Sequence, residues 1–188
     1  DPTGKPDSKL SQYHGLAVGV PGTVAGLARA LQDFGTMSLP QVVAPALALA
    51  ESGIAVTPDL ADSLRSSAKR LAAWPSSAKV FLKPDGSTPL PGETLRQADL
   101  AGSLRLVAEQ GPDGFYRGAT AEKIAAEVQK AGGNMTVEDL AGYEVKIREP
   151  VKGSYRGHDI LSMPPPSSGG IHIIQILNLL EPFPIGWL

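Results

Sequence analysis

Residues 143 to 163 read YEVKIREPVKGSYRGHDILSM, and apolar and polar side chains alternate in them along three short runs. The runs are Tyr143–Arg148, Val151–Arg156 and His158–Met163. Alternation at every second residue is typical of a half-buried strand, whereas the apolar residues of a helix recur every three or four positions. We therefore predict two or three short strands between residues 143 and 163.

Helical spacing dominates the chain before these runs. Apolar residues recur every three or four positions in five segments, and several of these segments begin with a cap residue or a proline, as helices do. Pro45 is expected to bend or delay the second helix, because proline lacks an N–H and its ring clashes with the preceding turn. The five helices follow Pro21, Ser38 and Thr57 and cover residues 95–111 and 121–131, and a short helical turn is expected after Thr136.

Three other stretches complete the prediction. Residues 1–17 form a polar leader, and residues 74–93 are rich in Pro, Ser and Gly, which predicts a long irregular segment with a tight turn at Lys83–Gly86. Residues 167–181 predict a helix that is apolar almost all round and therefore buried. The sequence thus predicts a mostly helical α+β fold in which residues 18–188 form a single unit, with helices over 18–142, strands over 143–163 and a helix over 167–181.

Length and composition exclude several classes of protein. The chain has 188 residues, 42% of them hydrophobic, which is enough for one sizeable core. The 17 Lys and Arg residues are balanced by 19 Asp and Glu residues, so no basic surface for nucleic acid is indicated. There is no Cys, which excludes thiolate catalysis and zinc–thiolate sites. The apolar stretch Ile171–Leu180 is too short to span a bilayer.

The main candidate site is the PSSGG segment that starts the last predicted helix. Its candidate residues are Ser167, Ser168, Gly169 and Gly170. Two hydroxyls and the free N–H groups of a helix start can hold an anion. A capped turn with glycines for close packing explains the same pattern without a ligand. Neither serine has a Lys or His nearby in sequence to act as a base, and no Gly-x-Ser-x-Gly motif surrounds them.

Other polar and glycine-rich features favour structural roles. His14, His158 and His172 lie in separate segments without a second ligand at metal-binding spacing, so a metal site is not supported. The glycine-rich run Gly19–Gly26 precedes a helix but has neither the Lys-Ser/Thr pair of a phosphate loop nor the glycine spacing of a dinucleotide site. A tight helix start with close backbone packing is the favoured interpretation of this run.

Three blocks of the sequence together resemble the large subunit of the γ-glutamyltransferases. The order and spacing of all three agree with that family, and the match runs from about Asp7 to Glu181. The first block holds Val18–Gly26, Phe34–Met37 and Pro45–Gly53; the second holds Phe115–Gly118, Gly132–Thr136 and Tyr143; the third holds Tyr155–Gly157 and Met163–His172.

The resemblance implies an N-terminal-nucleophile hydrolase with an αββα sandwich as the parent fold. A precursor of this kind cleaves itself into a large and a small subunit, and the new terminal threonine of the small subunit attacks the γ-glutamyl amide of glutathione or a related donor. The acyl group then passes to water or to an amine acceptor. Such a family needs no metal or cofactor, and its members are commonly periplasmic or exported.

By the same resemblance, the present chain is expected to be an internal large-subunit fragment without catalytic residues. The nucleophilic threonine is expected beyond Leu188, and the arginine that pairs with the glutamate carboxylate is expected before Asp1. Ser167 and Ser168 would then pack near the subunit junction. A β-lactam acylase, a polyglutamate transpeptidase of the same fold and a non-catalytic helical interaction module stay open as alternatives.

Overall fold

The computed structural model describes residues 4–187 of the chain. They form two compact units, the first ending at Val145 and the second beginning at Lys146. The folding of residues 18–188 as a single unit stays a prediction. No helix in the described part of the chain is long and apolar enough to cross a membrane.

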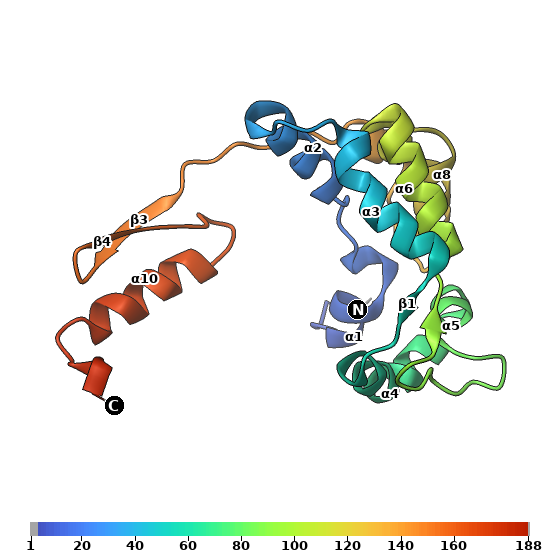
Figure 1. Cartoon of the computed structure of the whole chain (residues 1–188), viewed down its shortest axis with the longest axis horizontal. Helices are drawn as coiled ribbons and strands as arrows, with labels where there is room; N and C mark the ends of the chain where they lie inside the picture. Colours follow the sequence, from blue (N-terminus) through green and yellow to red (C-terminus); the bar gives the residue numbers. More distant parts are fainter. Residues whose placement is uncertain (1–3, 188) are drawn as a thin grey trace. The chain divides into compact units, whose positions relative to one another are not determined.

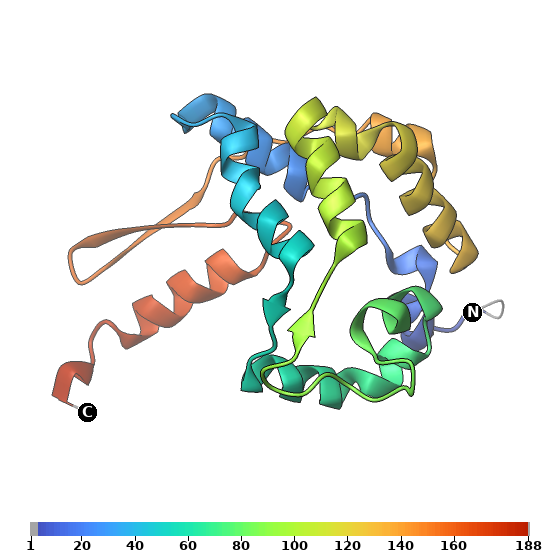
Figure 2. The same cartoon turned by 45° about the vertical axis from the view of Figure 1, so that its right-hand side comes forward.

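The first unit is mostly helical. Its helix α3 packs along α6, and both views show these two helices side by side (Figures 1 and 2). The elements are α1 (Ser8–Tyr13), the 3-10 turn η1 (Gly15–Ala17), α2 (Thr23–Phe34), α3 (Leu39–Ser52), β1 (Ile54–Ala55), α4 (Pro58–Ala72), α5 (Pro75–Phe81), β2 (Thr94–Leu95), α6 (Ala98–Gln110), α7 (Asp113–Tyr116), α8 (Gly118–Lys130) and α9 (Val137–Ala141).

Three of these helices start at the cap residues that the sequence indicated. Thr57 Oγ1 accepts a hydrogen bond of 3.2 Å from the backbone N–H of Leu60 at the start of α4. Thr136 and Asp139 form a reciprocal capping box at α9, and the N–H of Ser38 donates to the side chain of Gln41 at α3. Each bond gives a partner to a backbone N–H group at the helix start that has none within the helix.

The core of the first unit has two parts. Tyr116, Ala121, Ala125, Val128, Met135 and Leu140 form the larger cluster, which joins α7, α8 and α9. Val56, Ala61 and Leu95 form a smaller cluster under the antiparallel pair β1–β2, which Figure 2 shows beneath α3 and α6.

The second unit is a β-hairpin with one helix packed on it. Strands β3 (Val151–Tyr155) and β4 (His158–Ser162) are antiparallel, with Val151 opposite Ser162 and Tyr155 opposite His158. Exposure alternates along β3, as the sequence pattern predicted. Gly153 allows close contact with α10 (Gly169–Leu180), because a Cβ there would lie 2.6 Å from Ile174 Cγ2. The 3-10 turn η2 (Ile185–Trp187) follows.

A conformationally demanding turn connects the hairpin strands. Arg156 has a φ of 47° and Gly157 a φ of 80°, as tight hairpin turns require. The N–H of Arg156 donates to Glu181 Oε1 at 2.9 Å, so the residue after α10 holds the turn in place. The predicted mostly helical α+β class, with two strands between residues 143 and 163, is confirmed.

The predicted strand at Tyr143–Arg148 is wrong. Residues 143–150 form neither helix nor strand. The Tyr143 ring instead stacks on Tyr116, with centroids 5.5 Å apart and planes within 6°. An alternating segment forms a strand only where a second strand pairs with its backbone. Tyr143 packs against a helical core instead, where the described residues form no such strand.

The prediction of a wholly irregular segment over residues 74–93 is also wrong, since residues 75–81 form α5. Pro75 stands at the start of α5, as prolines do in first turns, and the Ser-rich composition concealed this signal. Helix α3 begins at Leu39 and runs through Pro45, so this proline does not delay it. The turn at Lys83–Gly86 is confirmed, since Gly86 N–H donates to Lys83 O at 2.9 Å.

Candidate functional site

The PSSGG segment forms a tight turn at the start of α10. Ser168 is the N-cap residue, but its side chain makes no cap hydrogen bond. Ser167 Oγ accepts instead from the N–H of Gly169, at 3.3 Å. Both serines are exposed, and within the described chain neither hydroxyl bonds a Lys or His side chain. The serines are therefore not arranged as nucleophiles with a general base.

The two glycines of this turn have different surroundings. Gly170 is buried, and a Cβ there would overlap the backbone of Met163, including its carbonyl oxygen. At Gly169 the nearest atom to a Cβ would be Ser167 Oγ, at 3.5 Å, which is ordinary contact. Gly170 thus allows α10 to start directly against the chain leaving β4. Of the two interpretations of PSSGG, the contacts favour close packing.

The glycine-rich run before α2 is anchored by two distant tyrosines. The Tyr116 hydroxyl donates to Pro21 O at 2.6 Å and accepts from the N–H of Ala25 at 3.2 Å. A Cβ on Gly22 would overlap the Tyr143 hydroxyl. Burial raises the pKa of Tyr116, so its hydroxyl stays protonated and available as a donor. The geometry agrees with a tightly packed helix start. Sequence reasoning missed Tyr116 and Tyr143, because no local signal marks a contact across more than 90 residues.

The three histidines lie in different surroundings. His14 Nδ1 accepts from the N–H of Leu16 at 3.3 Å and so caps η1, while His158 and His172 are exposed in the second unit. No group of three His, Cys, Asp or Glu side chains suited to a metal occurs among the described residues.

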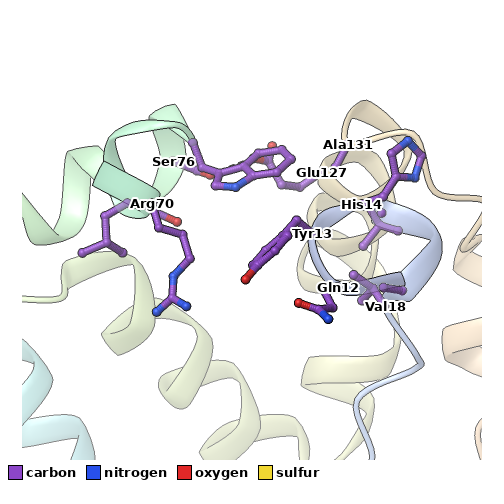
Figure 3. Close-up of a pocket in the computed structure, with 14 residues that line it drawn as sticks. Gln12, Tyr13, His14, Val18, Arg70, Ser76, Glu127 and Ala131 are labelled. Atoms are coloured by element: carbon purple, nitrogen blue, oxygen red, sulfur yellow. Dashed lines mark hydrogen bonds between the residues drawn. The ribbon is translucent and has the colours of Figure 1, made fainter. Parts of the chain in front are cut away.

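The first unit carries a pocket of about 430 Å³ between α1, η1, α4, α5 and α8 (Figure 3). Residues that line it include Tyr13, Arg70, Trp74, Ser76 and Glu127. Two of these lining residues are hydrogen-bonded to each other, since Ser76 Oγ donates to Glu127 Oε1 at 2.7 Å. None of these residues was singled out from the sequence, because they come from segments that were predicted to be irregular, polar or simply helical.

Comparison with known proteins assigns the fold to a family. The sequence profile of the gamma-glutamyltranspeptidase family matches residues 1–187. The chain belongs to this family. The match covers the anchored run before α2, the hairpin and the PSSGG turn, and it agrees with the resemblance seen in the sequence.

Individual members of the gamma-glutamyltranspeptidase family are similar to the chain over almost its whole length. The glutathione hydrolase proenzyme of Escherichia coli is 51% identical over 183 residues, which are 97% of this chain and 32% of that protein. The acylase ACY 1 proenzyme of a Pseudomonas species is 45% identical over 92% of this chain and 31% of that protein. This chain therefore spans about a third of the length of these curated relatives.

Solved structures are similar to the chain over most of its length. The gamma-glutamyltranspeptidase of Helicobacter pylori superposes with a TM-score of 0.91 at 46% identity, covering 97% of this chain and 52% of that one. The transpeptidase CapD of Bacillus anthracis gives a TM-score of 0.79 at 35% identity, covering 88% of this chain and 55% of that one.

Proposed function

We propose that this chain is a large-subunit segment of a γ-glutamyltransferase that cleaves the γ-glutamyl amide of glutathione and related donors. The observation that carries the proposal is the family match over residues 1–187, together with 51% identity to a glutathione hydrolase proenzyme. In this proposal the acyl group passes to water or to an amine acceptor without a metal or a cofactor.

The segment itself supports the catalytic site and supplies no catalytic residue. Its candidate hydroxyls, Ser167 and Ser168, bond no base, and its buried tyrosine, Tyr116, is occupied by two backbone bonds. The nucleophile of the complete enzyme is a threonine at the start of a small subunit that the same precursor releases. The names of the relatives support this, since those from E. coli and Pseudomonas are called proenzymes.

The rigid parts of the segment suit such a scaffold. Tyr116 and Tyr143 fix the run before α2 against the helical core, and Gly153 and Gly170 bring α10 onto the hairpin at van der Waals distance. Elements held by packing and satisfied backbone bonds keep catalytic groups within the small tolerances that chemistry requires. Residues Ser167 to Gly170 then pack near the junction with the small subunit. We place the complete enzyme in the periplasm or outside the cell.

A β-lactam acylase is the second candidate, because the ACY 1 proenzyme is 45% identical over 92% of the chain. A polyglutamate-cleaving transpeptidase would use the same scaffold. The differences among these activities lie in residues that contact the acyl group and its leaving group.

Hydrolysis of a γ-glutamyl anilide tests the proposal. The rate is measured for the 188-residue chain and for the protein expressed from the complete gene, with intact mass to detect self-cleavage. Activity confined to the self-cleaved protein supports the proposal. Turnover by the short chain, with no small subunit in its mass spectrum, contradicts it. A β-lactam amide hydrolysed faster than the anilide favours the acylase, and a complete gene product that cleaves neither favours a non-catalytic helical module.

A further inference from the structure

The pocket between α1, α4, α5 and α8 has no role in the function proposed above. It adjoins a second pocket of about 530 Å³, and the two share the side chains of Tyr13, Arg70 and Trp74. Volumes of this size are typical of sites for small organic ligands.

The walls of this pocket are fixed by backbone and side-chain contacts. The N–H of Gly15 donates to the carbonyl of Ala131 at 2.9 Å, and a Cβ on Gly15 would overlap the backbone of Gly133. The turn after α1 is therefore locked onto the end of α8. On the opposite side, the 2.7 Å bond from Ser76 to Glu127 ties α5 to α8. A ligand would meet a pocket that is already formed, which lowers the entropic cost of binding.

Arg70 supplies a positive charge that no carboxylate of the described chain neutralises. Its guanidinium donates to Ser67 Oγ at 3.1 Å. It forms no ion pair with any carboxylate of the described residues. By contrast, Arg65 on the same helix pairs with Asp62 at 2.9 Å. Lys69 lines the adjoining pocket and adds a second positive charge. A guanidinium in this position is suited to a carboxylate, which it can hold through two parallel hydrogen bonds.

Two aromatic side chains supply an apolar surface beside this charge. Tyr13 is 54% exposed and Trp74 37% exposed, although both line the pocket. The contacts between two aromatic rings within the described chain involve Phe115, Tyr116 and Tyr143 but neither Tyr13 nor Trp74. Figure 3 shows the Tyr13 side chain reaching toward the side of the pocket where Arg70 lies. Exposed aromatic faces next to an arginine favour a planar ring that carries an anionic group.

We propose that this pocket is a binding site for small aromatic carboxylates. The carboxylate pairs with Arg70, and the ring lies against Tyr13 and Trp74. Glu127 also lines the pocket, but its carboxylate accepts from Ser76, lies 3.9 Å from Lys130 and forms no ion pair with Arg70. The lining of the pocket belongs to the first unit and includes none of the residues Ser167 to Gly170.

The test is ligand-observed NMR on the protein from the complete gene, with phenylacetate as the probe. Phenylacetate should bind saturably, whereas 2-phenylethanol, which lacks the charge, and acetate, which lacks the ring, should each bind at least about tenfold more weakly. Arg70→Gln should weaken phenylacetate binding by about tenfold or more. Arg65→Gln is the matched control on the same helix and should change nothing. Saturating glutathione should leave the binding unchanged.

The proposal is overturned by the absence of saturable binding, by equal binding of 2-phenylethanol or of acetate, by binding that survives Arg70→Gln, or by competition by glutathione. Binding to the 188-residue chain but not to the complete protein also counts against it, because a further segment of the protein would then occupy the pocket. The rate of γ-glutamyl anilide hydrolysis should be the same in Arg70→Gln and wild type, which separates this proposal from the proposed function.

Discussion

The hydroxyl of Tyr116 lies 2.6 Å from the carbonyl oxygen of Pro21, which is 95 residues away in the sequence. The same hydroxyl accepts a hydrogen bond from the N–H of Ala25. One buried phenol therefore satisfies two backbone groups at the start of α2 and joins that start to α7.

Tyr116→Phe should destabilise the first unit by about 1–3 kcal/mol, because Pro21 O and Ala25 N–H lose their partner in a partly buried place. The ring and its stacking on Tyr143 remain, so the decrease in the free energy of unfolding is due to the hydroxyl alone. Urea unfolding of both proteins measures the change. Tyr13→Phe serves as the control, since this tyrosine is largely exposed, and an equal loss in the two variants would refute the anchoring role.

The local signals in the sequence predicted much of the helical structure. Ser38, Thr57 and Thr136 were each expected at the start of a helix, and each is an N-cap residue. The bonds at these helix starts join residues only three apart, and at Ser38 the bond runs from its N–H to the Gln41 side chain. Contacts across long separations gave no such signal. Tyr143 alternates with its neighbours like a strand residue, yet its position is decided by Tyr116.

The packing of the PSSGG segment was predicted in part, because some of its contacts are local. The glycines of PSSGG were expected to allow close packing, and Gly170 does so against Met163. The expected side-chain cap is absent at Ser168, where the backbone is helical rather than extended, so the hydroxyl does not reach the second or third N–H. The pocket around Arg70 depends on residues 12–18, 70–77 and 127–131 meeting in space, and no spacing within one of these stretches indicates it.

Gly170→Ala should destabilise the second unit by about 1–3 kcal/mol, since the added methyl group overlaps the Met163 backbone, which cannot move aside as a side chain could. Gly169→Ala is the matched control one residue earlier and should be neutral or slightly stabilising, because its Cβ meets only Ser167 Oγ at 3.5 Å. Thermal unfolding followed by circular dichroism compares the two. Equal melting temperatures of the two variants would show that the close approach at Gly170 does not affect stability.

The loop after α5 should show a dependence on pH that is due to Glu93. A hydrogen bond from Lys83, with a second from the N–H of Leu90, lowers the pKa of Glu93 from its ordinary value of 4.5. A pKa that is lower in the folded state stabilises the fold above the unfolded-state value, and this stabilisation is lost as the pH falls through the folded-state value. The difference in unfolding midpoint between wild type and Glu93→Gln should therefore be present at pH 7 and shrink below about pH 4.5. A difference that is constant between pH 3 and 7 would exclude the ionised carboxylate as its source.

The PSSGG turn should affect maturation of the complete enzyme more than its affinity for substrate. If Ser167 and Ser168 pack near the subunit junction, alanine at either position should slow self-cleavage by about fivefold, the effect of one lost hydrogen bond of about 1 kcal/mol. In that case the KM of the matured enzyme for a γ-glutamyl anilide should stay the same. Ser154→Ala, an exposed serine of β3, is the control. Gel analysis of subunit release measures maturation, and steady-state kinetics measure KM. A raised KM with normal maturation would indicate that the serines contact the substrate. Unchanged maturation and unchanged KM would exclude both a junction role and a substrate contact.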